Sequence, residues 1–163
     1  MQLLISEILD KVSKLKTKKE KIAWLRAQDT NGLRMVIKSS FDPKIRWLLP
    51  TGDVPFNRND APPGTEHTDL HMESRKMYHF VEGGNNTITQ NKRENLFIQM
   101  LEGLQENDAD VLIAAKDKIL HRKFKGLSDN VVKEAFNWTD EYMLNEGERV
   151  VYPQTPGPAS GPG

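Results

Sequence analysis

The sequence predicts an all-α protein, with about seven helices in a single domain. Three observations favour this class. Apolar residues recur at spacings of three and four along most of the first 150 residues, which is the period of a helix that buries one face. Residues that commonly cap helices stand before several of these stretches. No pair of alternating stretches indicates a β-hairpin.

The helices of the N-terminal third are indicated by local signals. Thr17 and Glu20 have the spacing of a capping box and open the second helix. Asp29 or Asn31 begins the third helix, which ends ahead of Pro43, because the residue before a proline is pushed out of the α region. The seven predicted helices span about residues 3–13, 17–28, 29–40, 68–82, 89–104, 108–120 and 128–136.

The later helices are delimited in the same way. Thr68 can cap a helix that runs to about Glu82, where Gly83-Gly84 terminates it. Asp108 is the predicted cap of the next-to-last helix, and Ser128 is the predicted cap of the last one.

Proline and glycine divide the chain into a domain and a tail. We expect one helical domain over residues 1–150, because a chain of 163 residues is long enough for one core. Residues 50–66 carry four prolines and two glycines and are predicted to form a long central loop. Residues 151–163 are predicted to be a Pro/Gly-rich, disordered tail.

The composition excludes several classes of protein. No apolar run approaches the ~18 to 20 residues that a membrane span needs, so we expect no membrane partner. The N-terminus shows no secretory signal, which favours a cytoplasmic location. The sequence contains no cysteine, which excludes disulfides, thiolate catalysis and cysteine-ligated zinc.

The formal net charge is zero, but the charges are sorted by region. Between Lys11 and Arg46, eleven basic residues stand against three acidic ones. Between Lys116 and Lys125, five basic residues stand against one. These clusters predict a binding face for a polyanion if the fold brings them together. If it does not, they are solvated helix faces.

The second cluster has chemistry that suits a phosphate. A basic run leads into Gly126 and then into Ser128, which can cap the following helix. A helix start combines free N–H groups, a cap hydroxyl and flanking cations, and such contacts position a DNA backbone without reading its sequence. The predicted DNA-binding residues are Lys16, Lys18, Lys19, Arg122, Lys123, Lys125, Gly126 and Ser128.

Motifs for catalysis are missing. The sequence has no phosphate-binding P-loop, dinucleotide fingerprint or nucleophile elbow. His67 and His71 have the i, i+4 spacing that can share a metal, but they lack the His-Glu-x-x-His order of a zinc hydrolase, and surface histidines are the simpler interpretation. We therefore expect no enzyme activity, no metal and no cofactor.

Two stretches have a recognisable order of features. Residues 3–50 contain Ile-Leu-Asp-Lys-Val, Thr-Lys-Lys-Glu-Lys-Ile-Ala-Trp-Leu, Leu-Arg-Met-Val-Ile and Ile-Arg-Trp-Leu-Leu-Pro, in this order. Residues 92–138 run from Lys92-Arg93 through Gly126-x-Ser128 to Phe136-Asn137-Trp138. Together they resemble the N-terminal DNA-binding domain of ATP-dependent DNA ligases, especially those of bacteriophages.

The resemblance implies an all-α half-clamp that grips duplex DNA from the minor-groove side through its backbone. Two departures matter. Arg122-Lys123-Phe124 stands where ligases usually carry an Arg-Asp-Leu-like stretch, and no Lys-x-Asp-Gly adenylation motif follows. Without the nucleophilic lysine, the adenylated intermediate cannot form. The resemblance therefore implies a stand-alone module and not a ligase.

Two functions remain open at this point. The first is a non-catalytic, sequence-independent accessory protein that binds double-stranded DNA. The resemblance implies a phage origin and action in the host cytoplasm. The second is an adaptor that binds a phage or host protein, or that belongs to the virion. In that case two acidic patches and the Pro153-x-x-Pro156 segment would matter more than the lysines. The first patch contains Glu102, Glu106, Asp108 and Asp110, and the second contains Asp140, Glu141, Glu146 and Glu148.

Overall fold

The computed structural model describes residues 2–59 and 68–145, and within them the protein is all-α, as predicted. The described residues contain no named strand and only two isolated bridges. The short helix α4 continues directly into a 3-10 helix, η1, so that this pair and six longer helices match the predicted seven. The elements are α1 (Ile5–Lys14), α2 (Lys18–Ala27), α3 (Asn31–Phe41), α4 (Leu70–Glu73), η1 (Ser74–His79), α5 (Gln90–Gly103), α6 (Glu106–Lys116), α7 (Leu120–Lys123) and α8 (Asp129–Phe136).

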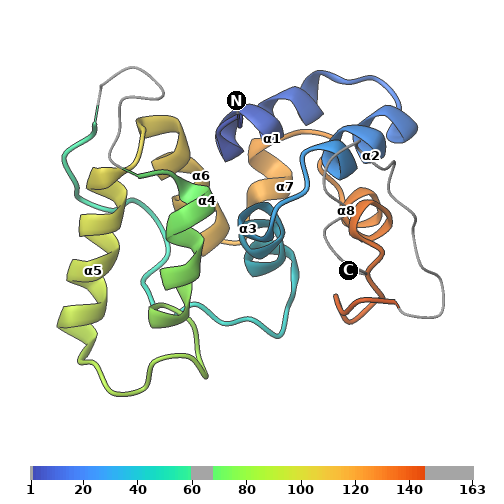
Figure 1. The fold of residues 1–163 in the computed structure, drawn as a ribbon. Helices are drawn as coiled ribbons and strands as arrows, with labels where there is room; N and C mark the ends of the chain where they lie inside the picture. The colour runs from blue at the N-terminus through green and yellow to red at the C-terminus, as the bar shows by residue number, and fades with distance from the viewer. Residues whose placement is uncertain (1, 60–67, 146–163) are drawn as a thin grey trace, which may run out of the picture.

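Helix α3 lies in the middle of the fold (Figure 1). It contacts α4, η1 and α6 on one side and α7 and α8 on the other. Helix α1 contacts α6 and α2, and α2 packs along α8 (Figure 1). The apolar stripes predicted from helical spacing form one core, which includes the fully buried Ile8, Leu33, Phe97 and Leu112.

The starts of α2 and α3 are set by threonine caps. The capping box at α2 is confirmed, because Thr17 accepts from the Glu20 N–H and the Glu20 carboxylate accepts from the Thr17 N–H. Thr30 caps α3 through a bond from Leu33 N–H, so the predicted start at Asp29 or Asn31 misses the cap by one residue. Helix α3 ends before Asp42, as the following proline predicts.

The helix predicted over residues 68–82 is shorter than expected. Its cap is Asp69, and the regular α-helix ends at Glu73, followed by η1 to His79. The reason is a tertiary contact, since residues 80–82 run beside residues 46–48. The Phe80 carbonyl accepts from Leu48 N–H, and the Arg46 carbonyl accepts from Glu82 N–H. This pairing engages the backbone groups of residues 80–82 with a distant segment, so the helix does not continue through them.

The helix predicted over residues 108–120 corresponds to α6, which ends earlier, at Lys116, and the separate short helix α7 begins only at Leu120. Gln105 caps α6, whereas Asp108 lies inside the first turn and is fully buried. Lys118 breaks the run, with a left-handed φ of 59°. Its amine donates to the Asp42 carbonyl over 2.6 Å, beyond the C-terminal end of α3. The chain therefore turns at this point before α7 begins.

The described part of the predicted central loop is held against α6. The Lys116 ammonium is buried and donates to the carbonyls of Pro50 and Gly52 over 2.6 and 3.1 Å. Further along, Arg58 pairs with Asp110 over 2.8 Å. Part of the predicted acidic patch thus fixes the loop. Residues 60–66 of the loop and the predicted tail, residues 151–163, lie outside the described residues.

Candidate nucleic-acid interface

Ser128 caps α8, as predicted, and places a hydroxyl at the start of that helix. Its Oγ accepts a hydrogen bond from Val131 N–H over 3.3 Å, and the residue is exposed. The hydroxyl hydrogen can still donate, and the first N–H groups of a helix have no acceptor within it. The start of α8 therefore offers several donors to an anion.

Gly126 brings a lysine from α2 to the same place. Its φ is 88°, a left-handed conformation that favours glycine. A Cβ atom at this position would lie 2.6 Å from Lys21 Nζ and 2.7 Å from Lys21 Cε. The absence of a side chain thus lets the Lys21 ammonium lie against the backbone that leads into α8.

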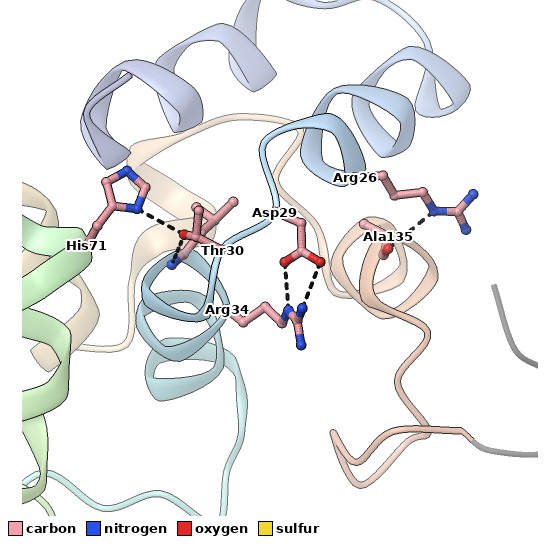
Figure 2. A network of polar contacts seen from close by, with 7 residues as sticks. Arg26, Asp29, Thr30, Arg34, His71 and Ala135 are labelled. Atoms are coloured by element: carbon pink, nitrogen blue, oxygen red, sulfur yellow. Dashed lines mark hydrogen bonds and ion pairs between the residues drawn. The ribbon is translucent and has the colours of Figure 1, made fainter. Parts of the chain in front are cut away.

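The packing of α2 on α8 produces this contact (Figure 2). Arg26 donates to the carbonyls of Glu134 and Ala135 over 2.8 and 3.2 Å, which satisfies acceptors at the C-terminal end of α8. Lys18 pairs with the Glu134 carboxylate over 2.7 Å. Because Lys21 lies one turn from Lys18, it is placed on the same side of α2, facing the junction.

Four of the predicted DNA-binding residues are exposed cations. Lys16 lies in the turn between α1 and α2, and Lys19 lies in the first turn of α2. Arg122 and Lys125 stand on either side of the end of α7. The described residues give none of these four an ion-pair partner, so their charges face solvent.

Lys123 lies beside acidic residues of α1. Its Nζ lies 5.6 Å from the centre of the Phe124 ring. The residue lines a hollow that also includes Glu7 and Asp10 of α1. Lys123 therefore belongs to an acidic neighbourhood and is the predicted site residue least suited to a phosphate.

Acidic charge at the start of α8 is compensated. Asp129 is the first residue of the helix, and its carboxylate pairs with Lys133 over 2.8 Å and accepts from the Tyr142 hydroxyl. The hydrogen bond with Asp129 is the main cause of a raised pKa of Lys133. Asp129 therefore repels an anion less than an isolated carboxylate would.

Two lysines of the second basic cluster have structural roles. Lys116 is buried and clamps residues 50–52, as described above. The Lys118 amine is bound to the Asp42 carbonyl, and partial burial lowers the pKa of this amine. The charge of this cluster that is open to solvent is therefore smaller than the sequence suggests.

Lys21 was missed as a site residue, although it belongs to the N-terminal lysine run. Its spacing of three from Lys18 was the available signal, because residues three apart lie on one helix face. The Lys21 side chain lies against Gly126. This contact joins segments about a hundred residues apart, so no local sequence pattern reveals it.

His71, one of the two histidines with metal-binding spacing, has a structural role. Its Nδ1 lies 2.9 Å from Thr30 Oγ1 (Figure 2). Its Nε2 lies 2.8 Å from the Leu3 carbonyl oxygen. Both ring nitrogens are thus engaged within the fold. His67 lies outside the described residues, and the residues described hold no group of three potential metal ligands.

Comparisons with known proteins identify a family but no named relative. Residues 8–122 match a family described as a family of unknown function (DUF6433). The matched segment covers more than two thirds of the chain, from within α1 to within α7. Comparison with curated proteins and with solved structures gave no match. Among the helices described, none is long and apolar enough to cross a membrane.

Proposed function

The chain belongs to DUF6433, a family of unknown function, and we propose from its own surface that it binds the backbone of duplex DNA without reading sequence. In this proposal the protein is a non-catalytic accessory factor. Lys21 and the junction at residues 126–128 hold phosphate groups, and the exposed cations Lys16, Lys19, Arg122 and Lys125 add charge around them.

The observation that carries this proposal is the approach of Lys21 to Gly126. It unites the two basic segments, which are about a hundred residues apart in sequence, at the start of a capped helix. An ammonium group, a free hydroxyl hydrogen and unpaired N–H groups at one place match the oxygens of a phosphate diester. Groups of this kind contact the DNA backbone and not the base edges, so they give no sequence preference.

The resemblance to phage DNA ligases supports the same proposal and adds a setting. We place the protein in phage DNA transactions in the host cytoplasm, where an accessory clamp would act on duplex DNA. The ligase-like identity of the fold and the phage origin are part of the proposal.

The test is the salt dependence of duplex binding. Fluorescence anisotropy with two labelled duplexes of unrelated sequence should give equal affinities that fall steeply with salt, because bound cations displace condensed counterions. Changing Lys21, Arg122 and Lys125 together to alanine should weaken binding to both duplexes. It should also flatten the logarithmic salt slope by about one for each lost phosphate contact.

A matched control removes three charges elsewhere. Arg75 and Lys76 lie on η1 and Lys92 lies on α5, on the other side of α3 (Figure 1). Changing these three to alanine removes the same net charge and should leave the affinity and the salt slope close to those of the parent. If both triple variants lose affinity equally, binding follows net charge and the proposed site is wrong. If the parent does not bind at low salt, the proposed function itself is wrong.

A second candidate, the protein-binding adaptor, is favoured by a groove beside α3. This hollow of about 420 Å³ has an apolar floor that includes Met35 and Trp138, and Arg34, Lys38 and Arg75 surround it. Met35 is 39% exposed. A groove of this chemistry suits a peptide with acidic residues around an apolar side chain. If the parent fails to bind DNA, this groove becomes the leading site.

A further inference from the structure

A second hollow opens directly beside the proposed phosphate site. Its volume is about 540 Å³, within the ~300 to 1,000 Å³ typical of small-molecule pockets. Ser40 and Phe41 at the end of α3 and His121 on α7 line it. Gly126 and Ser128 line it as well. The hollow thus shares two residues with the junction where Lys21 lies.

The walls of the hollow include three aromatic rings. The rings of Phe41 and His121 are tilted at 60° to each other, with centres 6.2 Å apart. Tyr142 lines the hollow as well, and its ring is held by a hydroxyl bond to Asp129 and by an edge contact with Trp138 at 6.0 Å. His121 is exposed, so an entering ligand can reach its ring.

The backbone around the hollow is held in an uncommon conformation. Lys118 and Tyr142 have φ angles of 59° and 60°, and both line the hollow, as does the left-handed Gly126. For a residue with a side chain, this region is disfavoured by the contact between Cβ and the carbonyl oxygen. The Lys118 amine is tied to the Asp42 carbonyl, and the Tyr142 hydroxyl is tied to Asp129, so tertiary contacts fix both walls before any ligand arrives.

Aromatic walls next to phosphate donors match the two halves of a nucleotide. Proteins bind unpaired bases by stacking them on aromatic or histidine rings. Here the rings lie in the hollow, while the hydroxyl of Ser128 and the ammonium of Lys21 lie at its edge. A paired base inside a duplex cannot enter such a hollow, because its faces are covered by its neighbours in the stack.

We propose that this hollow takes one unpaired nucleotide of a DNA end or gap, with its base beside Phe41 and His121 and its phosphate at residues 126–128. This inference rests on the proposed function and adds a substrate class to it. The protein would prefer duplexes that carry a short single-stranded extension or a gap over intact blunt duplexes of the same sequence.

The experiment compares labelled blunt duplex with the same duplex carrying a short single-stranded overhang, by anisotropy at one fixed salt concentration. The parent should bind the overhang about tenfold more tightly, because base stacking on an aromatic side chain is worth roughly one such factor or more. The variant His121→Ala should lose this preference and keep the blunt-duplex affinity of the parent. His121 is exposed and lies outside the set of backbone-contacting residues, so the fold should tolerate the change.

A matched control changes an aromatic ring far from the hollow. Tyr78 on η1 is 51% exposed, and Tyr78→Ala should leave both affinities at the parent values. Loss of the overhang preference in this variant as well would contradict the assignment of the hollow.

The other outcomes separate the inference from the proposal on which it rests. Equal affinity of the parent for blunt and overhang duplexes overturns the assignment of the hollow to a DNA end or gap and leaves duplex binding intact. A parent that binds neither DNA overturns both. Titration with free deoxyadenosine monophosphate tests whether the hollow binds a free nucleotide instead of a nucleotide of a DNA end. If the free nucleotide binds in a His121-dependent way and the overhang gives no preference, the hollow is a mononucleotide site and not a DNA-end site.

Discussion

The carboxyl group of Asp108 is completely buried between α1, α4 and α6. Its Oδ1 accepts from Ser6 N–H over 2.9 Å, and its Oδ2 has no hydrogen-bond partner among the residues described. Burial raises the pKa of this carboxyl, and hydrogen bonds from Ser6 and Leu70 and the nearby His71 oppose the shift only in part. The charged form is therefore disfavoured in the folded protein.

This burial makes the stability depend on pH. An acid whose pKa is raised on folding binds more protons in the folded state, so its stabilising contribution is complete below the unfolded pKa of about 3.9. The contribution is then lost as the pH rises through the raised folded value. The change Asp108→Asn keeps an acceptor for Ser6 and removes the charge. We expect the thermal midpoint of this variant, relative to the parent, to rise between pH 4 and pH 7.

An exposed carboxylate provides the comparison. Asp10 pairs with Lys14 on the surface of α1, with 55% of its side chain exposed. In calorimetry over the same pH range, the thermal midpoint of Asp10→Asn should not rise relative to that of the parent. A flat difference for Asp108→Asn as well would mean that Asp108 is hydrated in the folded protein.

Ser128 has a structural role that can be measured apart from binding. Its hydroxyl oxygen satisfies the Val131 N–H, which would otherwise lack an acceptor at the helix start. The change Ser128→Ala should lower the free energy of unfolding by about 1 kcal/mol, as measured by urea denaturation. Ser128→Asp should restore most of this loss, because aspartate also caps helices. A failure of Ser128→Asp to restore stability would contradict the capping role.

At the scale of elements, the pairing of α2 with α8 organises the basic surface. Arg26 binds two carbonyls at the C-terminal end of α8, while Lys18 makes an exposed ion pair with Glu134 on the same helix. The two contacts join the same helices but differ in environment. The Arg26 contacts satisfy backbone acceptors, whereas the Lys18 pair is about half exposed and is screened by water.

The two contacts should differ in their effect on stability. Arg26→Ala should cost about 1 to 2 kcal/mol, because it removes charge-assisted hydrogen bonds at a helix C-terminus. Lys18→Ala should cost less than about 1 kcal/mol, as surface ion pairs do. Urea denaturation of both variants makes the comparison. If Lys18→Ala proves as destabilising as Arg26→Ala, the α2–α8 contact depends on the ion pair and this account is wrong.

At the scale of the whole molecule, the fold separates exposed basic residues from those that hold distant segments together. The cations around Lys21 and residues 126–128 face solvent, whereas Lys116 and Lys118 are used to hold the central loop and the end of α3. Acidic Glu102 and Asp110 are used in the same loop contacts, with Asn57 N–H and with Arg58. A chain with no net charge thereby uses part of its charged residues within the fold and leaves other basic residues exposed.

The Pro/Gly-rich segment is expected to add nothing to the stability of this unit. Residues 153–163 contain four prolines and three glycines and no large apolar side chain, so they can neither form a helix nor contribute to the core. Deleting them should leave the thermal midpoint unchanged in differential scanning fluorimetry. A fall of several degrees would show that the segment docks on the domain.

The sequence by itself determined the class of the fold and most helix positions. The capping box at Thr17, the cap at Ser128 and the stop before Asp42 were all predicted and are confirmed. These features depend on hydrogen bonds and steric limits between residues within four positions of each other. Such interactions can be read from the order of residues alone.

The tertiary structure decided which of the charged residues remain free to bind. The Lys116 amine reaches carbonyls 64 and 66 residues away, and Lys118 reaches one 76 residues away. Lys21 meets Gly126, and Lys123 turns towards α1, through contacts of the same kind. The sequence does not distinguish an exposed lysine from one that binds a distant carbonyl. The difference depends on packing between distant segments, and neither hydrophobic periodicity nor local capping patterns encode that packing.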